Sequence, residues 1–328
     1  MGERFIINAK NGVGFRVGQG ERSVERFRFV PQQETIQKFL IGGNRPEDNR
    51  LTMTVNNRTE VLHRHEPGYQ QRKLKVLSIG AHPDDTALSE GLEHVLVEQG
   101  RKEGRKDTGL AVISLSPGQA NGDKDVRIGE DIQATERLGA DLYINLGFED
   151  GNLPAEKKQM MTRLKYYLQE LQPDIIILPD PEDKSHADHV AVAETVVEAL
   201  RENQQLPIVA YADHQFGDNE IQKGAFGFVL TDTHHRVWED AFLMDHPSQT
   251  AHRSTDVQQV VRRPRDRAVQ FSSTEVFLGI GRQDLEFSQV PISNFLGYSA
   301  VELTRPENDL SISLGPFIIF DHREVISV

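Results

Sequence analysis

Two short segments of this 328-residue chain carry histidine and aspartate at spacings that suit a metal-dependent hydrolase. They read A-H-P-D-D at residues 81–85 and S-H-A-D-H at residues 185–189. The two histidines of the second segment stand at i and i+3, so on a helix they project to the same side. His82, Asp85 and His189 together offer the nitrogen and oxygen ligands that hold a catalytic zinc with one position open for water.

Each segment directly follows an apolar run that is typical of a buried strand. Residues 75–79 precede the first segment and residues 174–179 precede the second. Such runs are common in parallel strands that are covered on both faces. Because ligands in open α/β sheets bind outside the carboxyl ends of the strands, we expect the two segments to meet there.

The alternation of strand-like and helix-like stretches from residue 73 onwards predicts the fold class. We expect a doubly wound, Rossmann-like α/β fold whose mostly parallel sheet has helices on both faces. Besides the two strands already named, the apolar runs predict strands at residues 110–115, 141–146, 208–212 and 226–230.

The two ends of the chain differ from this pattern. Residues 1–72 contain short strand-like pieces broken by Gly, Asn and Pro, which predict a β-rich extension without a helix. Residues 255–328 predict a second extension that is partly β, with a basic helix-like piece at residues 260–267. We expect residues 73–254 to form the central domain and the two extensions to pack together as an accessory β layer.

Composition excludes several classes of protein. The chain has no cysteine, so disulfides, thiolate metal sites and cysteine nucleophiles are excluded. Residues 1–73 hold 13 Lys and Arg against 8 Asp and Glu, which leaves the remainder strongly acidic and a poor nucleic-acid binder. The first ten residues lack the pattern of a signal peptide, and no apolar run is long enough to span a membrane. These features predict a cytoplasmic protein.

The two motifs, each placed after a strand, resemble the hallmarks of the zinc-dependent de-N-acetylases of the PIG-L (LmbE-like) superfamily. The resemblance covers residues 74–250. It implies one Zn²⁺ per chain, bound by His82, Asp85 and His189. It also implies that Asp84 takes a proton from water and returns it to the leaving amine, and that His186 stabilises the oxyanion.

Further matches to the family imply the substrate contacts and the reaction. Arg127 stands in an R-x-x-E pattern, Asp150 in a D-G turn after the third strand, and His246 in H-x-S-Q. The implied reaction removes an N-acetyl group from an N-acetylglucosamine-type sugar or glycoside and releases acetate and a free amine. The partner is then a small amino sugar, and homo-oligomerisation is left open.

The residues by themselves leave several assignments open. Asp84 and Asp85 can exchange the roles of base and ligand, and either His186 or His189 can be the second histidine ligand. Asp188, which stands between them, can orient a histidine or cap the helix. Iron or nickel would also accept this ligand set.

Two other functions compete with the deacetylase. A metal-dependent phosphoesterase of the usual two-metal type needs more carboxylates and histidines than the motifs supply. A non-catalytic sugar-binding module would be expected to lack one of the motif residues, and all of them are present.

Overall fold

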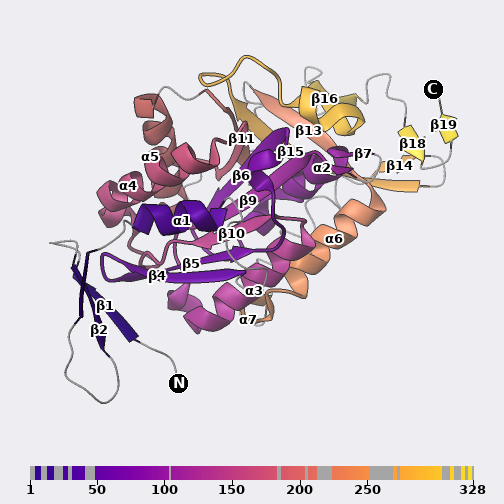
Figure 1. Ribbon diagram of the computed structural model, residues 1–328. Helices are drawn as coiled ribbons and strands as arrows, with labels where there is room; N and C mark the ends of the chain where they lie inside the picture. The colour runs from indigo at the N-terminus through magenta and orange to yellow at the C-terminus, as the bar shows by residue number, and fades with distance from the viewer. Residues whose placement is uncertain are drawn as a thin grey trace.

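A twelve-stranded mixed sheet forms the centre of the molecule (Figure 1). The computed structural model describes residues 4–8, 13–17, 25–28, 32–40, 49–102, 105–182, 186–203, 206–212, 224–250, 269–271, 274–304, 311–313, 319–321 and 324–326. Five neighbouring strands at the centre of the sheet are parallel: β12 (Ile208–Ala212), β11 (Ile175–Pro179), β6 (Leu74–Gly80), β9 (Thr108–Ser114) and β10 (Leu142–Asn145).

Antiparallel strands extend the sheet on both sides of this parallel centre. Next to β10 lie β5 (Arg58–Arg64) and then β4 (Arg50–Val55). Next to β12 lie β15 (Thr274–Asp284), β13 (Ala225–Leu230), β16 (Ala300–Thr304) and β17 (Ser311–Ser313), and β14 (Val269–Phe271) pairs with β15. The α/β fold class is therefore confirmed, with antiparallel strands at both edges.

The strands contributed by the two ends of the chain lie at opposite edges of the sheet. β4 and β5 form one edge, whereas β16 and β17 form the other. The expectation that the two extensions pack together is wrong for these strands, because the whole parallel centre separates them. The domain boundaries at residues 72 and 254 stay predictions, and residues 260–267 lie outside the described residues.

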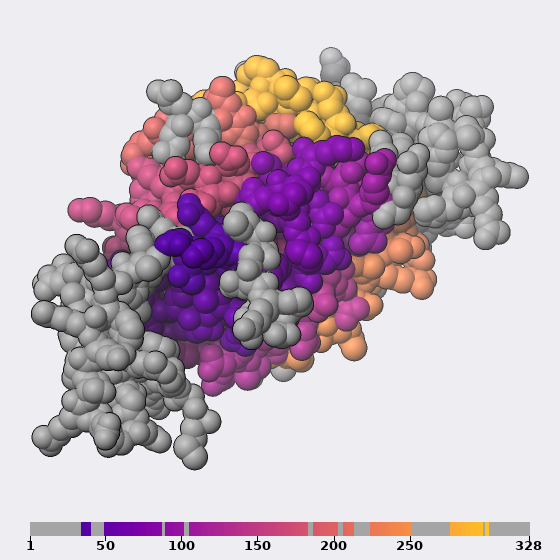
Figure 2. Space-filling view, viewed as in Figure 1, coloured from indigo at the N-terminus to yellow at the C-terminus, as the bar shows by residue number. Residues whose placement is uncertain are grey.

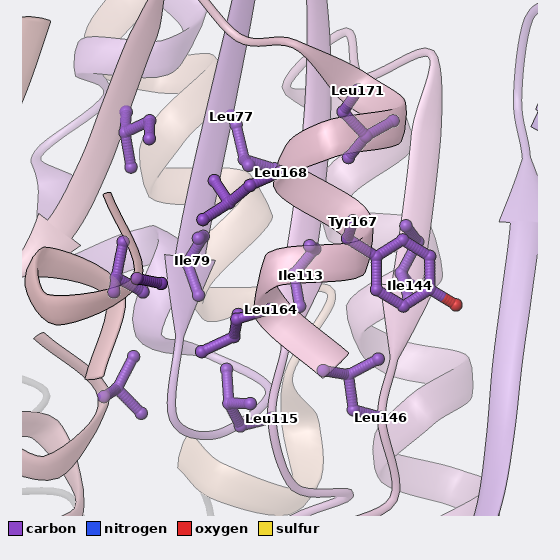
Figure 3. Close-up of a cluster of buried hydrophobic side chains, with 14 of the residues drawn as sticks. Leu77, Ile79, Ile113, Leu115, Ile144, Leu146, Leu164, Tyr167, Leu168 and Leu171 are labelled. Atoms are coloured by element: carbon purple, nitrogen blue, oxygen red, sulfur yellow. The ribbon is translucent and has the colours of Figure 1, made fainter. Parts of the chain in front are cut away.

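Helices cover both faces of the sheet and create two hydrophobic cores. α4 (Leu153–Leu171) and α5 (Ala187–Asn203) cover one face, and α2 (Leu92–Gln99) and α3 (Lys124–Arg137) cover the other. Side chains alternate along each strand, so Leu77 and Ile79 enter the first core and Val76 enters the second. Figure 3 shows Leu164, Leu168 and other side chains of α4 packed on the strands of the first core.

The N-terminal region contains a helix that its sequence pattern does not predict. α1 (Gln32–Leu40) has nine residues and buries Ile36, Phe39 and Leu40 in the same core as α4. Gln37 Nε2 donates a hydrogen bond to Glu170 Oε1 at 3.0 Å, and α1 lies beside the α4–α5 layer at the surface (Figure 2). A helix this short is stabilised mainly by tertiary packing, and for that reason periodicity alone misses it.

The remaining described elements are short. β1 (Arg4–Asn8), β2 (Val13–Val17) and β3 (Glu25–Arg28) form a separate three-stranded antiparallel sheet, while β7 (Arg101–Lys102) pairs with β8 (Arg105–Lys106) and β18 (Ile319–Asp321) with β19 (Glu324–Ile326). α6 (Asp232–Leu243) packs on α3, and α9 (Ser293–Leu296) packs on α2. Within the described residues, no helix is both long and apolar enough to cross a membrane.

A buried ion pair joins the antiparallel edge to α4. Glu60 on β5 is 1% exposed, and its carboxylate accepts hydrogen bonds from Arg163 Nε at 2.7 Å and Nη2 at 2.6 Å. We expect Glu60→Gln to lower the free energy of unfolding by about 3 kcal/mol, because the mutation leaves a buried guanidinium uncompensated. Urea unfolding would measure the change. The control is Glu202→Gln, which breaks an exposed ion pair with Lys165 and should cost less than about 1 kcal/mol.

Candidate metal and active site

The two motif segments meet where the order of the parallel strands reverses. From β6 the chain continues to β9 and β10 on one side, and later returns to β11 and β12 on the other. The turn of residues 81–85 follows β6, and α5 begins shortly after β11. The site therefore lies at the switch point between β6 and β11, as the sequence predicts.

His82 lies at the centre of this site and is buried. Its Nε2 is 3.1 Å from Asp150 Oδ1 and 3.2 Å from Asp188 Oδ2. Ring nitrogens of His82, His186 and His189 all lie within 4.8 Å of one another. The structure thus brings together three histidines and several carboxylates from three loops.

Asp85 is fixed by both of its carboxylate oxygens. Oδ2 accepts hydrogen bonds from the backbone N–H of Ala81 at 2.7 Å and of His82 at 3.0 Å, and Oδ1 lies 3.3 Å from His189 Nε2. Gly80 makes this position possible, because a Cβ at residue 80 would lie 2.6 Å from the Cβ of Asp85.

Asp84 is held in an unusual backbone conformation by Arg127. Its φ is 103°, which is rare for a residue other than glycine and is often found where function demands strain. Arg127 Nη2 donates to Asp84 Oδ1 at 3.0 Å and to the carbonyl of Pro83 at 3.3 Å, while Nη1 donates to the carbonyl of Gly118 at 2.5 Å. The arginine therefore links the 81–85 turn to the loop after β9.

Arg127 is 1% exposed, so in this structure it faces the protein rather than a substrate. Its role as a substrate contact stays a prediction, and the contacts seen here show it fixing Asp84. The sequence pattern could not reveal this, because an arginine near the start of a helix is usually solvated.

The other two residues expected to contact substrate occupy different parts of the site. Asp150 pairs with His82 and accepts a hydrogen bond from the backbone N–H of Ala120 at 3.0 Å. His246 is 2% exposed and precedes the short helix α7 (Pro247–Thr250), with Nε2 3.9 Å from Asp131 Oδ1. Both roles stay predictions, and His246 is the more enclosed of the two.

Asp188 serves both of the roles that the sequence leaves open for it in outline. Oδ2 contacts His82 and accepts a hydrogen bond from Gly151 N at 2.7 Å, and Oδ1 accepts one from Leu153 N at 3.2 Å. Asp188 thus orients the histidine and caps a helix, but that helix is α4 rather than its own. Only the folded chain shows which helix it caps.

The sequence of this region matches a known family. Residues 77–200 match the model of the PIG-L family, described as GlcNAc-PI de-N-acetylase. The chain carries a PIG-L domain. All five motif residues that meet at the switch point lie within the matched stretch. No curated protein sequence matches the chain.

Solved structures with a similar fold include three with the following measures. A conserved protein from Thermus thermophilus has 22% identity, with 66% of this chain and 95% of that chain covered, at a TM-score of 0.47. N,N'-diacetylchitobiose deacetylase from Pyrococcus horikoshii has 17% identity, with 82% and 99% covered, at 0.48. A deacetylase of teicoplanin biosynthesis has 15% identity, with 64% and 98% covered, at 0.48.

The electrostatics of the PIG-L domain concentrate opposite charges around His82. Burial by itself would lower the pKa of His82, but hydrogen bonds with Asp150, Asp188 and Asp85 outweigh burial and raise it well above its usual value. Burial opposes ionisation of Asp85, yet His189 and His82 hold the pKa of its carboxyl well below the usual range. The site is therefore built to place a positive charge among carboxylates.

His186 differs from the other two histidines. Burial, together with the neighbouring His82 and His189, lowers its pKa, so its imidazole is neutral at pH 7. The backbone N–H of Asp188 donates to His186 Nδ1 at 3.3 Å, which leaves the ring proton on Nε2. His186 is thus prepared to donate a hydrogen bond from Nε2, whereas a metal ligand would need that nitrogen bare.

The residues of the PIG-L domain fit a divalent metal ion. Among the described residues, two groups of side chains have ligand atoms close enough to share an ion: His82 with His186 and His189, and His82 with Asp150 and Asp188. Imidazole nitrogens combined with carboxylate oxygens suit zinc and the other late first-row metals. Of the histidines, His189 already contacts Asp85, so His82, Asp85 and His189 are the ligand set that the geometry favours.

Proposed function

We propose that this chain is a metal-dependent N-deacetylase that removes the acetyl group from an N-acetylglucosamine-type sugar or glycoside. The observation that carries the proposal is the meeting of the 81–85 turn with His186 and His189 at the switch point of the sheet. The PIG-L match over the same residues supports it, since the family is described as a de-N-acetylase. The products are acetate and the free amine.

His82, Asp85 and His189 would hold the metal ion, with one Zn²⁺ per chain as the proposed form. A bound zinc ion supplies Lewis acidity, which lowers the pKa of water and polarises an amide carbonyl. Asp150 and Asp188 orient His82 by accepting from its Nε2, and the backbone N–H groups of residues 81 and 82 fix the Asp85 carboxylate.

The remaining side chains handle the proton and the developing negative charge. Asp84 takes a proton from the attacking water and passes it to the nitrogen of the breaking C–N bond, while Arg127 holds its carboxylate in place. His186 donates from Nε2 to the oxyanion of the tetrahedral intermediate. Arg127, Asp150 and His246 are the proposed contacts to the sugar, and Asp150 is the one nearest to His82.

Elemental analysis of the purified protein beside an Asp85→Ala, His189→Ala double variant tests this proposal first. We expect about one zinc per chain in the wild type and none in the variant, because two of three ligands are lost. Wild-type protein should then release acetate from N-acetylglucosamine or its glycosides.

Three outcomes would contradict the proposed function. Absence of metal from the wild type, even after incubation with zinc, would favour a binding module. Hydrolysis of p-nitrophenyl phosphate without acetate release from any N-acetylated sugar would favour the phosphoesterase. Equal zinc content in the wild type and the double variant would refute the proposed ligands.

A further inference from the structure

Glu93 is a buried carboxyl group beside the candidate metal site that the proposed reaction does not use. It lies in the first turn of α2 and is 0% exposed. Ser78, near the end of β6, donates to Glu93 Oε1 at 2.9 Å, and Ser89 Oγ bonds to Glu93 Oε2. A carboxyl group buried this deeply needs such partners, because an unpaired charge there would be costly.

A count of hydrogens assigns the protonation of this cluster. Ser89 Oγ also lies 2.8 Å from the carbonyl oxygen of Thr86, which can only accept. A serine hydroxyl has one hydrogen, so if Ser89 donates to Thr86, the hydrogen between Ser89 and Glu93 must come from Glu93. Burial raises the pKa of Glu93 to about 7, which agrees with a protonated, neutral carboxyl group.

The hydrogen bonds of Glu93 connect both sides of the metal-binding turn. Ser78 lies on the strand that enters the turn, whereas Thr86 and Ser89 belong to the 3-10 helix η2 (Asp85–Ser89) that leaves it. Asp85 is the first residue of η2. The path from Glu93 through Ser89 to the carbonyl of Thr86 therefore ends one residue from Asp85.

A small cavity of about 10 Å³ separates Glu93 from Asp85. Its polar lining includes Ser78, Asp85, Ser89 and Glu93, and Gly80 lines it as well. Because packing is incomplete on this side of Asp85, close-packed side chains do not by themselves fix the position of the carboxylate. Hydrogen bonds that hold η2 against β6 then have the larger share in fixing it.

We propose that Glu93 is a positioning residue which, as a neutral carboxylic acid, ties η2 to β6 and thereby holds Asp85 where a metal ion can bind. The inference rests on the proposed function, since it takes Asp85 as a metal ligand. It assigns Glu93 no contact with the ion or the substrate.

Zinc affinity of three folded variants, measured by competition with a chromophoric chelator, tests the inference. Glu93→Met removes the hydrogen bonds at similar volume and should weaken zinc binding by about 10- to 100-fold, as for lost partners of metal ligands. Glu93→Gln should stay within about threefold of wild type, because its amide can accept from Ser78 and donate to Ser89. The control is Glu90→Gln, a buried carboxyl group on the same segment that instead accepts from Ile280 N, and it should bind like wild type.

A metal-free readout accompanies the affinities. Amide hydrogen exchange in residues 82–89 should be faster in Glu93→Met than in Glu93→Gln, because only the first loses the link to η2. If Glu93→Met fails to fold, Ser89→Ala cuts the same path with a smaller change, and weaker zinc binding with faster exchange is again expected.

The outcomes separate this inference from the proposed function. A wild type without zinc affinity would overturn both. A wild type that binds zinc, together with an equally tight Glu93→Met, would overturn the inference alone. Equal losses in Glu93→Gln and Glu93→Met would also overturn it, since a charged carboxylate rather than a neutral hydrogen-bonding group would then be needed. A wild type that binds zinc but releases no acetate would overturn the deacetylase and leave the positioning role intact.

Discussion

Asp84→Asn should lower kcat for acetate release by about 10²- to 10⁴-fold while the zinc content stays at the wild-type level. Asparagine has the same shape as aspartate and its Oδ1 can still accept from Arg127, but its amide cannot take a proton from water. Steady-state acetate release and elemental analysis of the same preparation measure the two quantities. The result would separate the role of proton acceptor from that of ligand.

The matched control for this change is Asp125→Asn. Asp125 is an exposed carboxylate in the first turn of α3, so its loss should leave kcat unchanged. Unchanged kcat in Asp84→Asn would refute the proposed base. Loss of zinc together with activity would mean that Asp84, rather than Asp85, binds the metal, which is the exchange of roles that the sequence leaves open.

Gly80→Ala should weaken zinc binding by about 100-fold although residue 80 contributes no ligand atom. The new Cβ would lie 2.6 Å from the Cβ of Asp85 and 3.3 Å from its Oδ2, so the carboxylate has to move. Movement of Asp85 breaks its contact with His189 and its two backbone hydrogen bonds. Chelator competition measures the affinity, and circular dichroism checks that the variant is folded.

Gly129→Ala is the control for adding a methyl group elsewhere in the same domain. A Cβ at residue 129 in α3 meets nothing within 4 Å, and alanine favours a helix over glycine. This variant should bind zinc like wild type and be at least as stable. Wild-type affinity in Gly80→Ala would show that Asp85 is not a ligand, or that the turn yields without loss.

Local patterns were sufficient to predict the centre of the fold and the meeting of the motifs. The apolar runs at β6, β9, β10 and β11 are fully or largely buried, and strands of this kind require helices on both faces. Once these strands are parallel and adjacent, His82 and His189 have to approach each other. The candidate site therefore follows from the topology.

Long-range contacts were not predictable in the same way. Arg127 and Asp188 have ordinary helix-terminal positions in the sequence, and only the fold brings them to Asp84 and to His82. α1 depends on a core that other segments build. The two chain ends lie at opposite edges of the sheet because nothing in their local composition specifies which strand each one pairs with.

The order of strands in the sheet also determines when the site can form during synthesis. β6, β9 and β10 leave the ribosome first and can pair with one another, so the first motif emerges on a partly formed sheet. β11 pairs with the opposite side of β6 and follows about a hundred residues later, and such non-local pairing is slow. The nascent chain therefore presents His82 and Asp85 without His189, and selective capture of metal has to wait until β11 has been added.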